Sequence, residues 1–213
     1  RFGLPVMVRV VTRLSHSRAN VRTRPPEKTD AGNGRRLAPD PNAWTLVPSN
    51  ARRRFRRLIE LQPQLREWSE KHPLNTLRLA GRRGVLAAGI AANYVGEALA
   101  GRDELSLLKM GTYPPPVELI RQLVNHCDEI LIVEEGYPFL EKRLNGLLGL
   151  AGKAVKGKLT GTLPPDGELT PDAVAAALGV PFAAGHAAIG DLTGRPPALC
   201  RGCPHADTFK AII

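Results

Sequence analysis

The sequence predicts an α/β fold in which a small parallel sheet is flanked by helices. Three short apolar runs, each bounded by charge or glycine, have the length and composition of buried strands: residues 84–89, 105–111 and 129–135. Helical stretches of about 10–12 residues separate these runs, and strands that alternate with helices are typical of parallel sheets with right-handed crossovers. With 213 residues and 43% apolar content, the chain can bury a substantial core.

The first twenty residues are expected to form a strand followed by a polar segment. The run "LPVMVRVVT" is largely apolar and β-branched, which predicts a strand buried on both faces. The cluster "TRLSHSRAN" follows it and contains Arg13, Ser15, His16 and Ser17. Ligands of doubly wound sheets collect just beyond the carboxyl ends of strands. These four residues are therefore site candidates, although ordinary loops have the same composition.

Residues 21–75 are predicted to be a basic linker and a helix. From Thr23 to Pro48 the chain is rich in Pro, Asp, Asn, Gly and Arg, and it has too little apolar surface to offset the entropy lost on ordering. A helix is expected after "PSN", where Ser49 or Asn50 can cap the free N–H groups. Pro63 lies within the apolar stripe of this helix and is expected to kink or split it.

The positive charge of the chain is concentrated in this N-terminal part. Residues 1–57 carry 14 basic and 3 acidic side chains, a net charge of +11, whereas the remainder carries 16 and 17, a net charge of −1. The densest run is "RRRFRR" at Arg52–Arg57. Such clustering allows a nucleic-acid interface, in which arginines neutralise phosphates. The alternative is a solvated basic helix face, or one that docks on an acidic protein surface, and the single ring in the run favours this alternative.

Beyond residue 75 the α/β domain is expected to cover residues 76–162, with a helix and linker over 163–195. Helices are predicted to begin near Ile90 and Pro115 and to cover "PFLEKRLNGLLGLAG", and "GKLTG" is expected to add a strand. In "ELTPDAVAAALGV" we expect Thr170 to be the N-cap, with Pro171 in the first turn, where the missing N–H costs nothing.

Two pairs of adjacent polar residues are candidate reactive groups. Glu134 and Glu135 end a predicted strand, where neighbouring side chains point to opposite faces. Only one of them can therefore serve a given site, and a capping or interdomain contact is the favoured role. His126 and Cys127 end a predicted helix about 100° apart, which disfavours a nucleophile pair and predicts that Cys127 is a small core residue.

The C-terminal "RPPALCRGCPHADTF" contains a CxxC pair, Cys200 and Cys203, followed by His205. A structural zinc ion needs four ligands, a cubane cluster needs four thiolates, and a thioredoxin-like pair needs a strand before it. The motif by itself completes none of these three kinds of site. Three cysteines in the chain, without a signal peptide or a long apolar run, predict reduced thiols and a cytoplasmic protein. The missing initiator Met and the abrupt "AII" predict a piece of a longer polypeptide.

Six stretches that occur in order along the chain resemble the α subunit of indolepyruvate:ferredoxin oxidoreductases. They are "LPVMVRVVTRLSHSR", "PNAWTLVPSNARRR", "KMGTYPPPVELIRQL", "EILIVEEGYPFLEKRL", "GELTPDAV" and "RPPALCRGCPHADTF". The resemblance implies five segments: residues 1–20 as the end of a pyrimidine-binding domain, 21–75 as the basic linker and helix, 76–162 as a transketolase C-terminal-like domain, 163–195 as a helix and linker, and 196–213 as the start of a diphosphate-binding domain.

The resemblance also implies an activity, the oxidative decarboxylation of aryl pyruvates such as indolepyruvate. Thiamine diphosphate with Mg²⁺ attacks the ketone, iron–sulfur clusters pass two electrons to ferredoxin, and CoA takes the acyl group. The implied partners are a β subunit, ferredoxin, CoA and an aryl 2-oxoacid. Neither a membrane nor nucleic acid is expected as a partner.

By the same resemblance, specific residues acquire expected roles. Arg13 and His16 become catalytic candidates, and Cys203, Pro204 and His205 become cofactor-binding candidates. Cys200 and Cys203 would be cluster ligands, or would line the thiamine pocket; Arg201 replaces a proline common in the family motif "CPGCPH". The 213 residues by themselves are expected to be inactive and to hold no cofactor.

Overall fold

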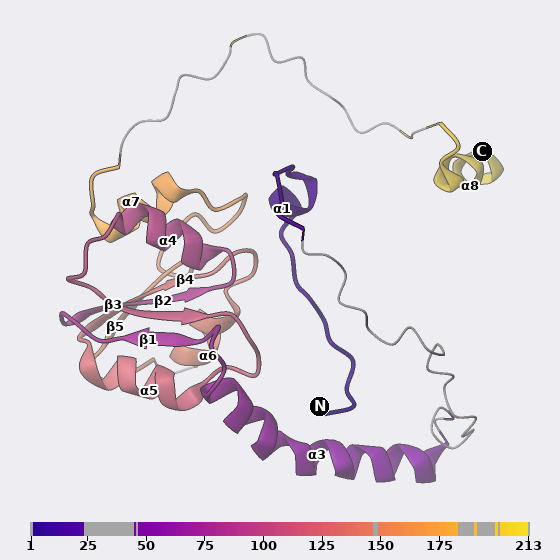
Figure 1. Cartoon of the computed structure of the whole chain (residues 1–213), viewed down its shortest axis with the longest axis horizontal. Coiled ribbons are helices and arrows are strands. Elements are labelled where there is room, and N and C mark those ends of the chain that lie inside the picture. The colour runs from indigo at the N-terminus through magenta and orange to yellow at the C-terminus, as the bar shows by residue number, and fades with distance from the viewer. Residues whose placement is uncertain are drawn as a thin grey trace. The chain divides into compact units, whose positions relative to one another are not determined.

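The computed structural model describes residues 2–23, 45, 47–146, 149–182, 190, 199 and 201–212. The chain divides into two compact units, Arg1–Phe182 and Ala183–Ile213, and each is described by itself. The first unit contains an α/β domain (Figure 1). Among the helices of the described residues, none combines the length and the apolar character that crossing a membrane requires.

The domain is built on one five-stranded sheet with the strand order β1-β3-β2-β4-β5. The strands are β1 (Thr76–Arg78), β2 (Arg83–Ala88), β3 (Ser106–Met110), β4 (Glu129–Val133) and β5 (Ala154–Lys156). Strands β2 to β5 are parallel, as expected, and the three apolar runs form β2, β3 and β4. The short edge strand β1 pairs with β3 in the antiparallel sense, which makes the sheet mixed. An antiparallel edge strand is common on an otherwise parallel sheet.

Helices cover both faces of this sheet (Figure 1). The covering helices are α4 (Ala91–Leu99), α5 (Val117–His126), α6 (Phe139–Asn145) and α7 (Pro171–Leu178). Before them in the chain come a short α1 (Thr12–His16) and the long α3 (Pro48–Glu70), which extends away from the sheet and contacts α5. Side chains of consecutive strand residues point to opposite faces. One face, with Val85, Ala87, Leu107, Leu131 and Val133, packs on α4 and α7. The other, with Leu86, Leu108, Met110, Ile130 and Ile132, packs on α5 and α6.

Several local expectations are confirmed in this domain. The Thr170 side chain accepts a hydrogen bond from the Ala173 N–H and caps α7, with Pro171 in the first turn. Cys127 is fully buried in the core, as expected of a small apolar residue. A Cβ at Gly84 would lie 2.7 Å from the Cys127 Sγ, so β2 can pass this close to the end of α5 only with glycine there.

Other local expectations are wrong. Helix α3 begins at Pro48 without a side-chain cap, because the Asn50 amide donates to the Thr45 carbonyl and accepts from Arg53 instead. Pro63 lies within a single helix, so the expected split does not occur, although α3 changes direction along its length, as a kink requires (Figure 1). The "GKLTG" segment, 157–161, is a turn in which the Gly161 N–H donates to the Lys158 carbonyl, and the added strand β5 comes directly before it.

The expected N-terminal strand is also absent from the described residues. Residues 2–11 have no regular secondary structure, and Val6 and Met7 are 87% and 93% exposed. A strand buried on both faces needs a neighbour on each side to pair its backbone N–H and C=O groups. The strands among the described residues all belong to the sheet of the α/β domain, and residues 2–11 do not join it.

A buried amide joins the end of α3 to the sheet. The Asn75 side chain is 6% exposed, and its Oδ1 accepts from the Gly111 and Thr112 N–H groups at 2.8 and 3.1 Å. Its Nδ2 donates to the Ser69 carbonyl and to the Thr112 hydroxyl, both at 2.8 Å. The Glu70 carboxylate adds a second link, because it accepts from the Glu118 and Leu119 N–H groups at the start of α5. These contacts fix the C-terminal end of α3 to the domain.

Replacing Asn75 with Ala should therefore destabilise the domain strongly. The variant leaves several buried backbone groups without partners, and we expect the free energy of unfolding to fall by about 3 kcal/mol. Urea unfolding followed by circular dichroism measures it. Asn93→Ala on the exposed side of α4 is the control, with an expected change within about 0.5 kcal/mol. Equal effects of the two substitutions would contradict the role of Asn75.

Candidate functional site

The carboxyl end of β4 leads into two adjacent carboxylates with separate structural roles. Glu134 is 4% exposed, and its oxygens accept from the Leu140 N–H at 3.1 and 3.0 Å and from the Glu141 N–H at 3.0 Å. These are free N–H groups of the first turn of α6, where a negative charge is favourable. The expected capping role is confirmed for Glu134.

Glu135 points to a different element. Its Oε1 accepts from the Leu169 N–H at 3.2 Å, just before α7. Its Oε2 is buried and has no hydrogen-bond partner among the described residues. The two glutamates therefore contact separate segments, the start of α6 and the loop before α7, and do not form a paired acid/base device.

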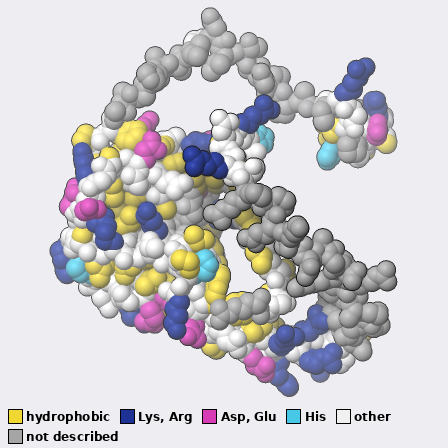
Figure 2. Space-filling model, viewed as in Figure 1, with side chains coloured by type: hydrophobic (Ala, Val, Ile, Leu, Met, Phe, Trp, Pro, Cys, Tyr) yellow, Lys and Arg dark blue, Asp and Glu magenta, His cyan; other side chains and the backbone are white. Residues whose placement is uncertain are grey.

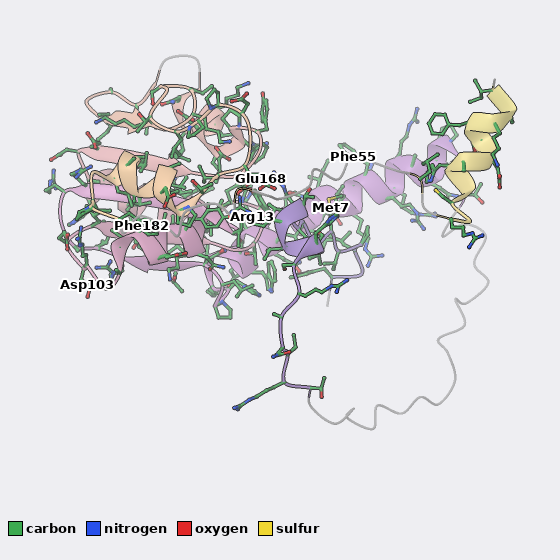
Figure 3. All side chains as sticks on the ribbon, turned by 90° about the horizontal axis from the view of Figure 1, so that it is seen from above. Met7, Arg13, Phe55, Asp103, Glu168 and Phe182 are labelled. Atoms are coloured by element: carbon green, nitrogen blue, oxygen red, sulfur yellow. The ribbon has the colours of Figure 1, made fainter. Side chains whose placement is uncertain are left out.

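Next to Glu135, three side chains from distant parts of the sequence meet. Arg13 of α1 contacts Glu168 through its Nη2 at 2.8 Å and its Nε at 3.3 Å, and Figure 3 shows the two side chains side by side. The Arg13 Nη1 also donates to the Tyr94 hydroxyl at 3.3 Å, from α4. The hydrogen bond to Glu168 raises the pKa of Arg13 further above its ordinary value. Arg13, a predicted catalytic residue, is thus engaged by groups of the α/β domain.

Tyr94 is largely buried beneath this cluster, with 7% of its surface exposed. Burial raises the pKa of the Tyr94 phenol above its ordinary value of 10.0, and the negative charge of Glu135 acts in the same direction, while Arg13 opposes it. Neither Tyr94 nor Glu168 was predicted from the sequence. Tyr94 lies in an ordinary amphipathic helix pattern and Glu168 in a Gly/Pro-rich loop, so neither carries a local signal.

His16, the other predicted catalytic residue, lies at the end of α1. Its side chain is exposed and makes no hydrogen bond within the described part of the chain. The imidazole is therefore free to meet a group from outside these residues. Arg13 contacts the Tyr94 hydroxyl of the α/β domain, whereas the His16 side chain makes no such contact within the described part of the chain.

The predicted cofactor-binding residues belong to the unit Ala183–Ile213. Cys203 is partly buried, and its Sγ lies 3.4 Å from the Nδ1 of His205 at the start of α8 (Pro204–Ile212). Cys200 falls outside the described residues. Within the described ranges, no three His, Cys, Asp or Glu side chains are grouped so that they could hold a metal ion.

His126 and Cys127 do not form a reactive pair, as predicted. The His126 Nε2 lies 2.8 Å from the Ala80 carbonyl oxygen, on the outside of the domain. The Cys127 thiol is enclosed in the core, against Leu123 and the backbone of β2. The two side chains therefore face different surroundings.

The arginine run lies on the exposed N-terminal half of α3. All five arginines, Arg52, Arg53, Arg54, Arg56 and Arg57, are exposed, and basic side chains gather there (Figure 2). Arg53 donates to the Asn50 side chain at 2.8 Å. Phe55 is 64% exposed among them. This half of α3 combines positive charge with an exposed apolar ring.

Proteins of known name are similar to nearly the whole chain. The indolepyruvate oxidoreductase subunit IorA of Methanothermobacter thermautotrophicus is 36% identical in an alignment of 229 residues, gaps included. The alignment covers 99% of this chain and 36% of that protein. The subunit of the same name from Archaeoglobus fulgidus is 30% identical and is matched over 100% of this chain and 36% of its own length. The chain thus spans about a third of these curated relatives.

No protein-family model matches the chain. A solved structure, 2-oxoglutarate:ferredoxin oxidoreductase from Magnetococcus marinus with 2-oxoglutarate, coenzyme A and succinyl-CoA bound, is similar over 63% of this chain and 24% of its own. Its TM-score is 0.43 and its sequence identity is 14%.

The position of Tyr94 predicts how stability depends on alkaline pH. Because the folded state raises the pKa of this phenol, its contribution to stability is fully present below pH 10 and is lost as the pH rises through the folded-state value. Tyr94→Phe should therefore reduce the loss of stability above pH 10, as measured by urea unfolding between pH 8 and 11. Burial also raises the pKa of Tyr113, so this second phenol still contributes to the loss of stability at alkaline pH in the Tyr94→Phe variant.

The exposed Tyr137 provides a matched control, since Tyr137→Phe removes a phenol from the surface of the same domain. A pH dependence of unfolding that is the same in Tyr94→Phe as in the unmodified chain would contradict the buried position of Tyr94.

Proposed function

Because this chain belongs to the family of indolepyruvate oxidoreductase α subunits and spans about a third of its curated relatives, we propose that it is part of a 2-oxoacid oxidoreductase. The observation that carries the proposal is the sequence similarity, which extends over 99% of the chain at 36% identity. The resemblance predicted from the six sequence stretches is thereby confirmed. An aryl pyruvate such as indolepyruvate is the proposed substrate, and the cytoplasm is the proposed compartment.

The proposed reaction balances with ferredoxin and CoA as co-reactants. The bond between the ketone carbon and the carboxylate of the 2-oxoacid breaks and releases CO₂. A thioester bond forms between that carbon and the CoA sulfur, and the thiol proton is released. Two electrons leave the substrate and reduce two ferredoxin molecules by one electron each. A β subunit is the proposed protein partner.

The described residues do not by themselves form a complete site for the cofactors of such a reaction. A four-iron cluster needs four thiolates, but the chain has three cysteines, and Cys127 is buried in the core. A Mg²⁺ ion needs several oxygen ligands, and no suitable group of three occurs among the described residues. A four-iron cluster would therefore need at least one thiolate from outside these 213 residues.

We assign roles to this chain's own residues within that enzyme. His16 is the proposed catalytic group of α1, because its imidazole is exposed and unpaired within the described residues. Cys203, Pro204 and His205 are proposed to line the cofactor pocket, with Cys200 and Cys203 as candidate cluster ligands. The α/β domain over 76–162 is proposed to be a transketolase C-terminal-like unit that supports assembly. The remaining domain boundaries stay predictions.

The assembled enzyme provides the test. The complete α subunit is co-expressed with its β subunit, and CoA-dependent ferredoxin reduction is measured with indolepyruvate, pyruvate and 2-oxoglutarate. We expect indolepyruvate to give the highest kcat/KM.

His16→Ala should lower kcat by about 10²-fold, the usual effect of losing an acid/base group. His126→Gln, on the outside of the α/β domain, is the matched control. Full activity of His16→Ala would contradict the role of His16, and no activity with any 2-oxoacid would overturn the function.

The exposed arginines of α3 favour a second candidate function, a nucleic-acid interface. The enzyme proposal expects duplex DNA to bind no more tightly than nonspecific binding, about 10⁻⁴–10⁻⁶ M at physiological salt. If the interface is real, the negative slope of log affinity against log salt should become less steep by about 3 in Arg54→Gln/Arg56→Gln/Arg57→Gln, about one unit per lost phosphate contact. Arg82→Gln/Arg121→Gln, which changes exposed arginines elsewhere, is the control.

A further inference from the structure

The N-terminal segment of the first unit contacts the rest of that unit at three points. The Phe2 ring packs edge-on against Trp68 of α3, with ring centres 6.1 Å apart. The Arg9 Nη2 donates to the Glu135 carbonyl at 2.9 Å, just beyond β4. Arg13 then contacts Glu168 and Tyr94. Apart from the half-buried Val11, the residues between these contacts are exposed, so these three side chains make the main contacts of the segment.

Tyr94 and the backbone next to Glu168, which receive Arg13, are held by the core. Tyr94 is buried between the sheet and α7, among the residues that cover one face of the sheet. Glu168 precedes Leu169, which is 1% exposed and whose N–H donates to the Glu135 carboxylate. The Tyr94 ring and the backbone that follows Glu168 therefore have fixed positions, while the Glu168 side chain itself is 54% exposed.

The backbone next to this cluster is shaped for the approach of Arg9. Gly136 has a positive φ of 77°, and a Cβ at that position would lie 2.9 Å from the Arg9 Nη2. A side chain at residue 136 would thus strain the backbone and displace the guanidinium. The Lys158 Nζ donates to the Gly136 carbonyl at 2.9 Å and holds this turn from the other side.

The contacts of Arg13 occupy the fork of its guanidinium. Nε and Nη2 both face Glu168, and Nη1 faces Tyr94. A planar guanidinium in this arrangement has little capacity left for a substrate carboxylate or phosphate. His16, three residues later, has no such contact and stays exposed.

We propose that Glu168 and Tyr94 are positioning residues that hold α1 through Arg13 and thereby place His16 at the edge of the domain. Arg13 is then the anchor of this segment and not a catalytic residue. The domain that covers residues 76–162, together with Glu168, thus has a part in arranging the site and is more than a support for assembly. The anchoring itself is independent of the proposed function, whereas the placement of His16 for catalysis rests on it.

Limited trypsin digestion of this 213-residue chain tests the anchoring. Trypsin must bind the arginine side chain before it cleaves, so the bond after Arg13 should be cut more slowly than the bonds after the exposed Arg18 and Arg22. Because the ion pair is partly exposed, Glu168→Gln should raise the rate at Arg13, relative to Arg18, by a modest factor of about two to five. Glu168→Gln combined with Tyr94→Phe should raise it further.

Glu118→Gln is the matched control, because Glu118 pairs with Arg121 on the exposed side of α5. It should leave the ratio of cleavage at Arg13 to cleavage at Arg18 unchanged. Circular dichroism and the thermal midpoint confirm that each variant is folded. An unchanged ratio in the folded Glu168→Gln/Tyr94→Phe variant would overturn the anchoring.

The assembled oxidoreductase tests the positioning role separately. Glu168→Gln should lower kcat several-fold while leaving the thermal midpoint and the KM for CoA unchanged, and Glu168→Asp, which keeps the charge, should restore part of kcat. An unchanged kcat in Glu168→Gln, in an enzyme that loses activity with His16→Ala, would overturn the positioning role and leave the proposed function intact. If the Glu168 and Tyr94 substitutions do not speed trypsin cleavage after Arg13, the anchoring is overturned whatever the enzyme activity of these variants.

Discussion

Strand β2 must bury both of its faces, because it lies between β3 and β4 in the middle of the sheet. Leu86 faces one layer of helices and Val85 and Ala87 face the other, and all three are at most 1% exposed. Helices are therefore needed on both sides, and the crossovers between parallel strands supply them. The same crossovers bring the carboxyl ends of β2 and β4 to one edge of the sheet. At this edge Arg9 donates to the Glu135 carbonyl, and Arg13 contacts the Tyr94 and Glu168 side chains, so the layered arrangement is what brings these groups together.

Carboxylates buried near this edge are stabilised mainly by backbone N–H groups. Glu134 caps α6, and the fully buried Glu141 accepts from the Leu159 N–H at 3.2 and 3.1 Å. Removing a carboxylate from water is costly unless hydrogen bonds replace the water. Glu135 is the exception, since one of its oxygens lacks a partner among the described residues. Its negative charge favours cationic neighbours, and the two arginines of the N-terminal segment approach this same edge.

The central part of the fold could be predicted from the sequence, because burial on both faces leaves a clear apolar run. The segments that became β2, β3 and β4 were found this way, and Thr170 was found as a cap because its position before Pro171 has a local signal. Strands β1 and β5 could not be found, since three residues such as "TLR" or "AVK" carry no periodicity. The N-terminal run was predicted as a strand from composition alone, although a strand also needs neighbours with which to pair.

The candidate site was predictable only in part, for a related reason. Arg13 and His16 stood out as a polar cluster after an apolar run, but the partners of Arg13 lie 81 and 155 residues away in the sequence. No spacing or motif links such distant positions. Asn75 likewise has the sequence context of an ordinary loop residue. Its structural role follows only from its hydrogen bonds with the Gly111 and Thr112 N–H groups, which are distant in the sequence.

The two edges of the sheet have a consequence for how a larger protein can be built around this domain. Both β1 and β5 are only three residues long, and the Arg78 side chain at the end of β1 is paired with Asp103. Such short edges offer few free backbone groups to a strand from another chain or domain. Growth of the sheet by strand addition is therefore disfavoured. Neighbouring domains and subunits have to be recruited through helix faces and loops, where side chains rather than backbone groups decide which surface fits.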